Sequence, residues 1–180
     1  MLKPWKKISS KLLNQTRVFS LYSERSCSPD GSHEDDFFYL ECPSWVNVIP
    51  LTDNGEVVLI RQYRHGTKTI ELEIPGGIVD CGEDPEATAV RELKEETGYV
   101  SSHIESLGFT HANPAIQTNR CYSYLATGCK LNDKQNLDPA EDIAVELVPL
   151  ASIPTLLRTQ QITHSLVVCA FAFYYLRESS

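Results

Sequence analysis

The sequence lacks several features that would assign it to a specialised class. Its longest uncharged apolar run, Leu166 to Leu176, is too short for a membrane-spanning helix, which needs about 20 residues. No two cysteines form a CxxC pair, and their spacing matches no common zinc site. There is no internal repeat and no low-complexity tract. These absences argue against a membrane-spanning protein, a zinc module and a repeat protein.

The sequence also lacks an excess of positive charge and a secretory signal. Lys and Arg number 16 and Asp and Glu number 24, so the formal charge is 16 − 24 = −8. Affinity for nucleic acid comes from clustered Lys and Arg, so we expect neither nucleic acid nor a membrane as a partner. A small anion remains a possible ligand if metal ions supply positive charge. Without a signal for an oxidising compartment, we expect a cytoplasmic protein with six free thiols.

What is present is typical of a globular protein. The chain has 180 residues, of which 42% are hydrophobic and 22% are charged. This length suits one domain with a small appended element. We expect residues 1–43 to form an N-terminal arm of β-strands and residues 44–180 to form the main domain.

Alternating apolar residues and turn signals predict a mixture of strands and helices. Asn54-Gly55 favours a hairpin, and Pro75-Gly76-Gly77 forces a turn. The predicted strands cover residues 17–26, 37–42, 45–51, 56–63, 71–74, 106–110, 121–127 and 143–148, and the predicted helices cover 85–97, 150–158 and 163–178. The fold class expected from this order is α+β, an α/β/α sandwich around a mixed sheet, with the strand-rich arm in front.

The clearest helix carries three carboxylates on one face. Asp84 is a suitable N-cap, Pro85 suits the first helical position, and Gly98 suits the end. Glu92, Glu95 and Glu96 are three and four positions apart, so they share a face, whereas Val90 and Leu93 are expected to face the core. The plain interpretation of this pattern is an acidic, solvated surface. Pairing of Arg91 with Glu95 would relieve part of the repulsion between the like charges.

The segment before the helix favours a second interpretation. Hard divalent cations such as Mg²⁺ bind carboxylate and carbonyl oxygens. Gly76-Gly77 follows a strand and leads through a loop to the acidic helix, which brings a backbone carbonyl beside it. Glu83 lies just before the helix, where the helix dipole favours a carboxylate, and it is also placed to hold Arg91.

The spacing of these residues resembles the Nudix box. All seven of its fixed positions are occupied, by Gly77, Glu83, Arg91, Glu92, Glu95, Glu96 and Gly98. Leu93 is the first apolar position, and Tyr99 stands where an aliphatic residue is usual. Trp45 to Pro50, the VVLIRQYR segment at 57–64 and the ELEIPGG segment at 71–77 are similar to the ADP-ribose pyrophosphatase branch. That branch includes nucleoside-diphosphate-sugar hydrolases.

The resemblance implies an enzyme that cleaves a diphosphate with Mg²⁺, or with Mn²⁺ in its place. It implies metal ligands at Glu92, Glu95, Glu96 and the carbonyl of Gly76, with Glu95 alternatively positioning metal-bound water. Arg91 and Glu83 are implied as orienting residues. The expected substrates are nucleoside diphosphate sugars such as ADP-ribose and GDP-mannose, and the expected products are a nucleoside monophosphate and a sugar phosphate.

The same resemblance suggests further site residues outside the box. Glu141, in the acidic loop 136–142, is the candidate general base, although such a loop is equally explained as solvated surface. Arg64 resembles an arginine that contacts substrate phosphates. Asn119 and Arg120 are candidate contacts to sugar or phosphate. Trp5 and Trp45 are candidate stacking partners for the base, although core packing also explains them.

The resemblance leaves the assembly and two other functions to be weighed. The N-terminal arm is similar to an element through which relatives form swapped homodimers, so we expect a homodimer. A Nudix module that senses ADP-ribose without cleaving it is one alternative, but it would not need three repelling carboxylates. A nucleoside triphosphate pyrophosphohydrolase is the other, but those enzymes are usually shorter and lack the N-terminal strands.

Overall fold

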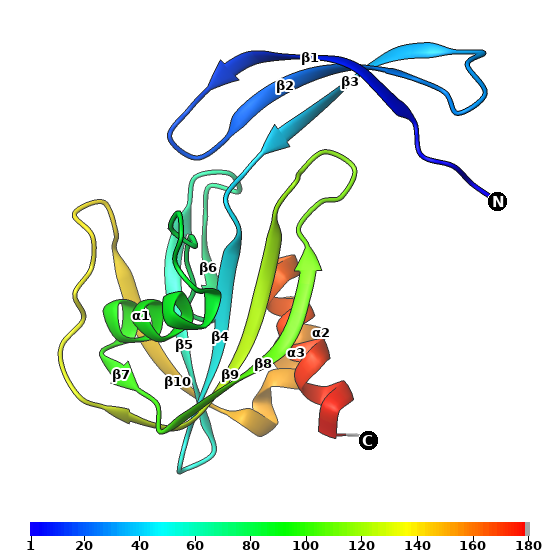
Figure 1. The fold of residues 1–180 in the computed structure, drawn as a ribbon. Coiled ribbons are helices and arrows are strands. Elements are labelled where there is room, and N and C mark those ends of the chain that lie inside the picture. Colours follow the sequence, from blue (N-terminus) through cyan, green and yellow to red (C-terminus); the bar gives the residue numbers. More distant parts are fainter. Residues whose placement is uncertain (179–180) are drawn as a thin grey trace. The chain divides into compact units, whose positions relative to one another are not determined.

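The structure of the chain, a computed structural model, describes residues 1–178. The chain divides into two compact units (Figure 1). The first comprises Met1–Pro43 and His111–Arg120, and the second comprises Ser44–Thr110 and Cys121–Ser180. Within the described part, no helix has the length and apolar character needed to cross a membrane.

The first unit is built on a three-stranded antiparallel sheet in the order β1-β2-β3. Its strands are β1 (Lys6–Gln15), β2 (Ser20–Cys27) and β3 (Glu34–Glu41). The sequence predicts the second and third of these to within a few residues but not β1, whose residues are all exposed and show no strict alternation. Residues 111–120 belong to this unit because Leu40 exchanges backbone hydrogen bonds with Ile116 and Thr118, at 2.7 and 3.1 Å.

The second unit is built on a seven-stranded mixed sheet. The main path runs β10-β5-β4-β9-β7, with β6 paired to β5 and β8 paired to β9. β4 and β9 are parallel, whereas β5 is antiparallel to β4, β6 and β10. The strands are β4 (Trp45–Thr52), β5 (Glu56–Arg64), β6 (Thr69–Glu73), β7 (Tyr99–Val100), β8 (His103–His111), β9 (Arg120–Leu131) and β10 (Ile143–Pro149).

Three α-helices belong to this unit: α1 (Pro85–Thr97), α2 (Ile153–Arg158) and α3 (Ser165–Glu178). The helix expected at 150–158 is in fact a 3₁₀ turn, η1 (Leu150–Ser152), followed by the short α2. Pro154 lies near the start of α2, where its missing N–H costs no hydrogen bond.

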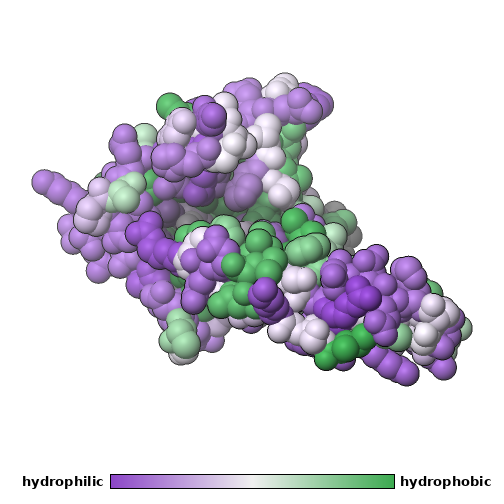
Figure 2. Space-filling view, turned by 90° about the horizontal axis from the view of Figure 1, so that it is seen from above, coloured by the Kyte–Doolittle hydropathy of each residue, from purple (hydrophilic) through white to green (hydrophobic). Residues whose placement is uncertain are grey.

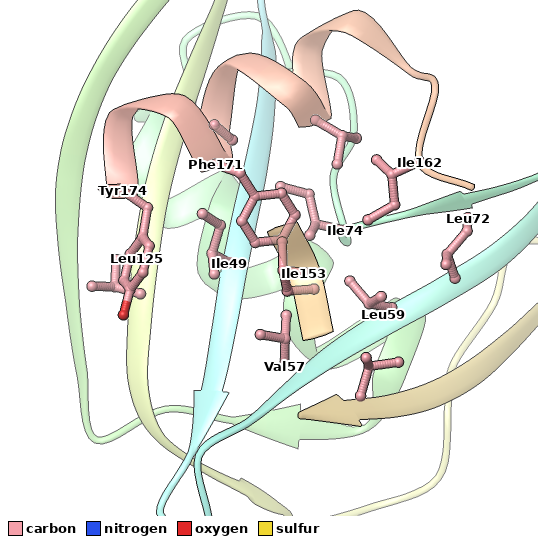
Figure 3. Close-up of a cluster of buried hydrophobic side chains, with 13 residues drawn as sticks. Ile49, Val57, Leu59, Leu72, Ile74, Leu125, Ile153, Ile162, Phe171 and Tyr174 are labelled. Atoms are coloured by element: carbon pink, nitrogen blue, oxygen red, sulfur yellow. The ribbon is translucent and has the colours of Figure 1, made fainter. Parts of the chain in front are cut away.

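Two cores on opposite faces of the sheet make the second unit a sandwich. Residues alternate between the faces, so Val48 of β4 packs with Leu93 of α1, whereas Ile49 packs with Phe171 of α3. Figure 3 shows the second of these cores, in which Phe171 and Tyr174 meet Ile49, Val57 and Leu125. The predicted α+β class with a mixed sheet is therefore confirmed.

The face shown in Figure 2 is largely hydrophilic, with hydrophobic residues gathered in patches. In the first unit, several large apolar side chains are exposed: Trp5, Ile8, Leu12, Leu13, Val18, Phe37 and Phe38. All six cysteines are free thiols.

Candidate active site

Helix α1 begins and ends where the sequence predicts. The Asp84 carboxylate accepts hydrogen bonds from the N–H groups of Glu86 and Ala87, at 3.1 and 3.3 Å, and Pro85 follows at the first helical position. Gly98 closes the helix with a left-handed φ of 75° and donates its N–H to the Lys94 carbonyl. These caps fix where the helix begins and ends.

The buried face of α1 includes one of the three predicted metal ligands. Ala89, Leu93 and Glu96 follow one another at i+4 and i+3, and all three are buried. The expectation that Val90 faces the core is wrong, because it lies one residue beyond this stripe and is 46% exposed. Glu96 instead occupies an inward position, where it is 3% exposed.

The glycine loop lies directly against these carboxylates. The N–H of Gly76 donates to Oε2 of Glu96 at 2.8 Å, and no hydrogen bond to the Gly76 carbonyl is found among residues 1–178. Gly77 exchanges backbone hydrogen bonds with Val46 of β4, at 2.9 and 3.1 Å. A β-carbon at Gly77 would overlap the Glu92 carboxylate, so a larger residue there would force that side chain to move.

Arg91 joins three of the predicted site residues. Its Nη1 donates to Glu92 and to Glu95, each at 2.9 Å, and its Nε and Nη2 donate to Glu83, each at 3.1 Å. The hydrogen bond from Arg91 holds the pKa of Glu83 at about 2, and the same pairing raises the pKa of Arg91. The expected pairs of Arg91 with Glu83 and Glu95 are therefore present.

Burial disfavours the charged form of the two inner carboxylates, Glu92 and Glu96. Burial raises the pKa of Glu96 to about 8, although the Gly76 N–H lowers it, and the charges of Glu92 and Glu141 raise it further. Burial also raises the pKa of Glu92, against the opposing effect of Arg91. A site with this excess of buried carboxylates favours a cation.

The donor set suits a hard divalent cation, but its side chains are not gathered around one point. Among the described residues, no group of three His, Cys, Asp or Glu side chains converges closely enough to hold a metal ion. Glu92 and Glu95 turn toward Arg91, whereas Glu96 turns toward the Gly76 N–H. The chemistry fits a metal through three carboxylates and one unbonded carbonyl, and binding requires these carboxylates to reorient.

Arg64 is held by Glu73, which also contacts His164, and no motif in the sequence indicates either contact. Its Nε and Nη2 donate to the two carboxylate oxygens of Glu73, at 2.7 and 2.8 Å. Nδ1 of His164 lies 3.0 Å from Oε2 of Glu73. The pairing of β5 with β6 offers the missing signal, because Gln62 faces Glu71 and the alternation then places Arg64 and Glu73 on one face.

Glu141 lies in the acidic loop between β9 and β10. Its backbone N–H donates to the Asp138 carbonyl, and its carboxylate accepts from the Asp138 N–H at 3.0 Å. Its charge acts on Glu92, Glu96 and Arg64 and raises the pKa of each. The loop therefore brings the candidate base within electrostatic reach of the other site residues.

The remaining predicted contacts are divided between the two units. Trp45 begins β4 and bridges to Ile78, next to the glycine loop. Trp5, Asn119 and Arg120 belong to the first unit, so their roles in the site stay predictions. Trp5 packs edge-on against Phe37 with ring centroids 5.2 Å apart. Asn119 is buried, and within residues 1–178 neither of its amide atoms has a hydrogen-bond partner.

Known proteins are similar to this chain in sequence and in fold. Residues 43–169 match the model of the NUDIX domain. The chain is 28% identical over 175 residues to the ADP-ribose pyrophosphatase of Bacillus subtilis, a match that covers 97% of this chain and 94% of that protein. It is 35% identical over 142 residues to the methanol dehydrogenase activator of Bacillus methanolicus, a match that covers 76% of this chain and 75% of that protein.

A solved structure shares the architecture. The crystal structure of an ADP compounds hydrolase superimposes with a TM-score of 0.84 and 23% sequence identity, over 99% of this chain and 95% of that one. At this level of identity the likeness concerns the fold.

Proposed function

Because the chain belongs to the NUDIX family, we propose that it hydrolyses the pyrophosphate bond of nucleoside diphosphate sugars such as ADP-ribose and GDP-mannose. The products are a nucleoside monophosphate and a sugar phosphate. The observation that carries this function is the set of Glu92, Glu95 and Glu96 on α1, of which Glu92 and Glu96 lie against the loop at Gly76 and Gly77. The names of the relatives, ADP-ribose pyrophosphatase and ADP compounds hydrolase, support the substrate class.

Glu92, Glu95, Glu96 and the Gly76 carbonyl would hold a divalent cation. Mg²⁺ is the expected ion and Mn²⁺ its substitute, because both prefer oxygen ligands. When bound, such an ion neutralises the diphosphate and lowers the pKa of water. Burial raises the pKa of both Glu92 and Glu96, and a bound cation would stabilise their charged forms, which supports this assignment.

The other residues bind the substrate, move a proton or orient the ligands. Arg64 presents a guanidinium to the diphosphate, which suits the fork of donors on this side chain. Glu141 accepts a proton from the attacking water. Arg91, braced by Glu83, holds Glu92 and Glu95 in place. Trp5, Trp45, Asn119 and Arg120 are the proposed contacts to the base and the sugar.

We propose that the protein is a cytoplasmic homodimer assembled through the arm at residues 1–43. The apolar side chains exposed on this arm, among them Ile8 and Phe38, support burial against a second copy. The free cysteines suit a reducing compartment. The net charge of −8 supports a small-molecule substrate, with no nucleic acid or membrane as a partner.

A turnover screen with Mg²⁺ and, separately, EDTA tests this function. The panel contains ADP-ribose, GDP-mannose, UDP-glucose, a dinucleoside polyphosphate and the nucleoside triphosphates, with products identified by mass spectrometry. We expect metal-dependent release of a monophosphate from the sugar conjugates. Pyrophosphate released from triphosphates alone would instead indicate a triphosphate pyrophosphohydrolase. Binding of ADP-ribose without turnover would indicate a sensing module.

A further inference from the structure

The loop that carries Glu141 is attached to the end of the helix that carries the carboxylates. After β9 the chain crosses the C-terminal end of α1, where the N–H groups of Asn132 and Asp133 donate to the Gly98 carbonyl, at 3.0 and 3.2 Å. The N–H of Asn136 donates to the Glu95 carbonyl at 2.8 Å. The last carbonyls of a helix lack partners within it, and this segment supplies some of them.

One side chain links the start of the loop both to α1 and to β10. Nε2 of Gln135 donates to the Glu96 carbonyl at 2.6 Å and to the Ile143 carbonyl at 3.0 Å. An amide nitrogen carries two hydrogens, so a single group satisfies both acceptors. Gln135 therefore ties both the end of α1 and the first residue of β10 to the start of loop 136–142.

Hydrogen bonds, rather than side-chain packing, hold the chain in place at Gln135, where the loop begins. Gln135 is exposed, and it lines an open hollow together with Tyr99, Leu131 and Leu147. Within loop 136–142 only Leu137 and Glu141 are even partly buried. Loss of the two amide hydrogen bonds would leave the loop with the Asn136 contact and its own Asp138–Glu141 turn.

We propose that Gln135 is a positioning residue that sets Glu141 relative to the carboxylates of α1. The carbonyl it binds belongs to Glu96, a proposed metal ligand, so one amide couples the metal-binding helix to the loop of the proposed base. The inference rests on the proposed function, in which Glu141 accepts the proton from water. Gln135 itself does not touch the substrate.

The kinetic test uses a variant of matched shape. Gln135→Met keeps the length of the side chain and removes both donated hydrogen bonds. We expect kcat for ADP-ribose to fall about tenfold, the size of one to two neutral hydrogen bonds, with KM changed less than about twofold. Gln161→Met is the control, because Gln161 Nε2 makes only a local bond to Thr159 at 3.1 Å, and it should leave kcat unchanged.

A double-mutant cycle separates positioning of Glu141 from a general structural role. If Gln135 acts through Glu141, Gln135→Met should lower kcat in the wild-type background and have no further effect in the Glu141→Gln background. An equal loss in both backgrounds would mean that Gln135 acts on α1 instead, and no loss in the wild type would mean that it positions nothing. Either result overturns the proposal.

Amide hydrogen exchange tests the anchor without any turnover. Gln135→Met should speed exchange in residues 136–142 and leave the first turns of α1 unchanged. Unchanged exchange in the loop would overturn the anchoring role. A Glu141→Gln variant with wild-type kcat would show that the proposed base is wrong, so that failure is distinguished from a failure of the anchor itself.

Discussion

The buried carboxylate of Glu73 accepts two hydrogen bonds from Arg64, one from Nε at 2.7 Å and one from Nη2 at 2.8 Å. Glu73 is 2% exposed, whereas the Arg64 side chain is 42% exposed. His164 lies against the same carboxylate from the connection that precedes α3. Glu73 thus anchors the guanidinium by two of its nitrogens. Nη1 forms no hydrogen bond within residues 1–178, and we propose that it binds a phosphate of the substrate.

Replacing Glu73 should weaken both the fold and substrate binding. Glu73→Gln leaves Arg64 without its charged partner, so we expect a loss of about 1–3 kcal/mol in the free energy of unfolding and a rise in KM of about tenfold. Urea denaturation and steady-state kinetics measure the two effects.

Glu146→Gln is the matched control. It removes another carboxylate that accepts from an arginine Nε at 2.7 Å, but the Arg61–Glu146 pair is exposed on both sides. An exposed pair contributes at most about 1 kcal/mol. Equal destabilisation by the two variants would contradict the special role of the buried pair.

The same carboxylate predicts how stability depends on pH. Burial alone raises the pKa of Glu73, but the hydrogen bonds from Arg64 and His164 outweigh it and hold the pKa at about 2, below the ordinary 4.5. A carboxyl whose pKa is lower in the folded protein contributes stability that is complete above pH 4.5 and is lost as the pH falls to about 2.

Urea unfolding of the wild type and Glu73→Gln across this range checks the sign. The wild type should be the more stable above pH 4.5, and its advantage should shrink as the pH falls toward 2. A difference that stays constant over the range would show that the charge of Glu73 is not its source.

Gly77→Ala should impair catalysis through a steric effect on Glu92. The added β-carbon would overlap the Glu92 carboxylate, so that side chain must leave its position beside Arg91. We expect kcat to fall by about 100-fold, as for a misplaced catalytic group. Gly66→Ala is the control, because nothing lies within 4 Å of a β-carbon there. Similar kinetics for the two variants would show that Glu92 tolerates displacement.

Glu96→Gln should nearly abolish turnover while the protein stays folded. The amide keeps the shape and can still accept the Gly76 hydrogen bond, but it removes the charge that a divalent cation needs. Circular dichroism and turnover with Mg²⁺ measure the two properties. Glu86→Gln, on the exposed first turn of α1, should retain full activity. Unchanged turnover in Glu96→Gln would remove Glu96 from the metal site.

Charged residues on the arm should break the proposed dimer. Ile8→Asp combined with Phe38→Asp places two carboxylates among the exposed apolar residues of the first unit, so we expect light scattering to report a monomer with low activity. Ile70→Asp, at an equally exposed apolar position of β6, should leave the mass unchanged. A dimeric, active arm variant would refute assembly through residues 1–43.

The parts of the candidate site that could be predicted are those that depend on residues close together in the sequence. Asp84, Pro85 and Gly98 delimit α1, and the spacing of Glu92, Glu95 and Glu96 places them on one helix. The pairs of Arg91 with Glu83 and Glu95 also follow from spacing, because these residues are within about two turns of each other. Val90 was mispredicted because helical spacing alone does not say which side faces the sheet.

The sequence by itself therefore determined the acidic helix, its caps, the glycine loop and the alternation that builds the sheet, since each depends on residues close together in the chain. Only the tertiary structure decided that Glu73 binds Arg64 and His164, and that Gln135 ties Glu96 to Ile143. These contacts join residues from separate elements. Their partners are set by strand register and by where a loop crosses a helix, and neither is encoded in the spacing of neighbouring residues.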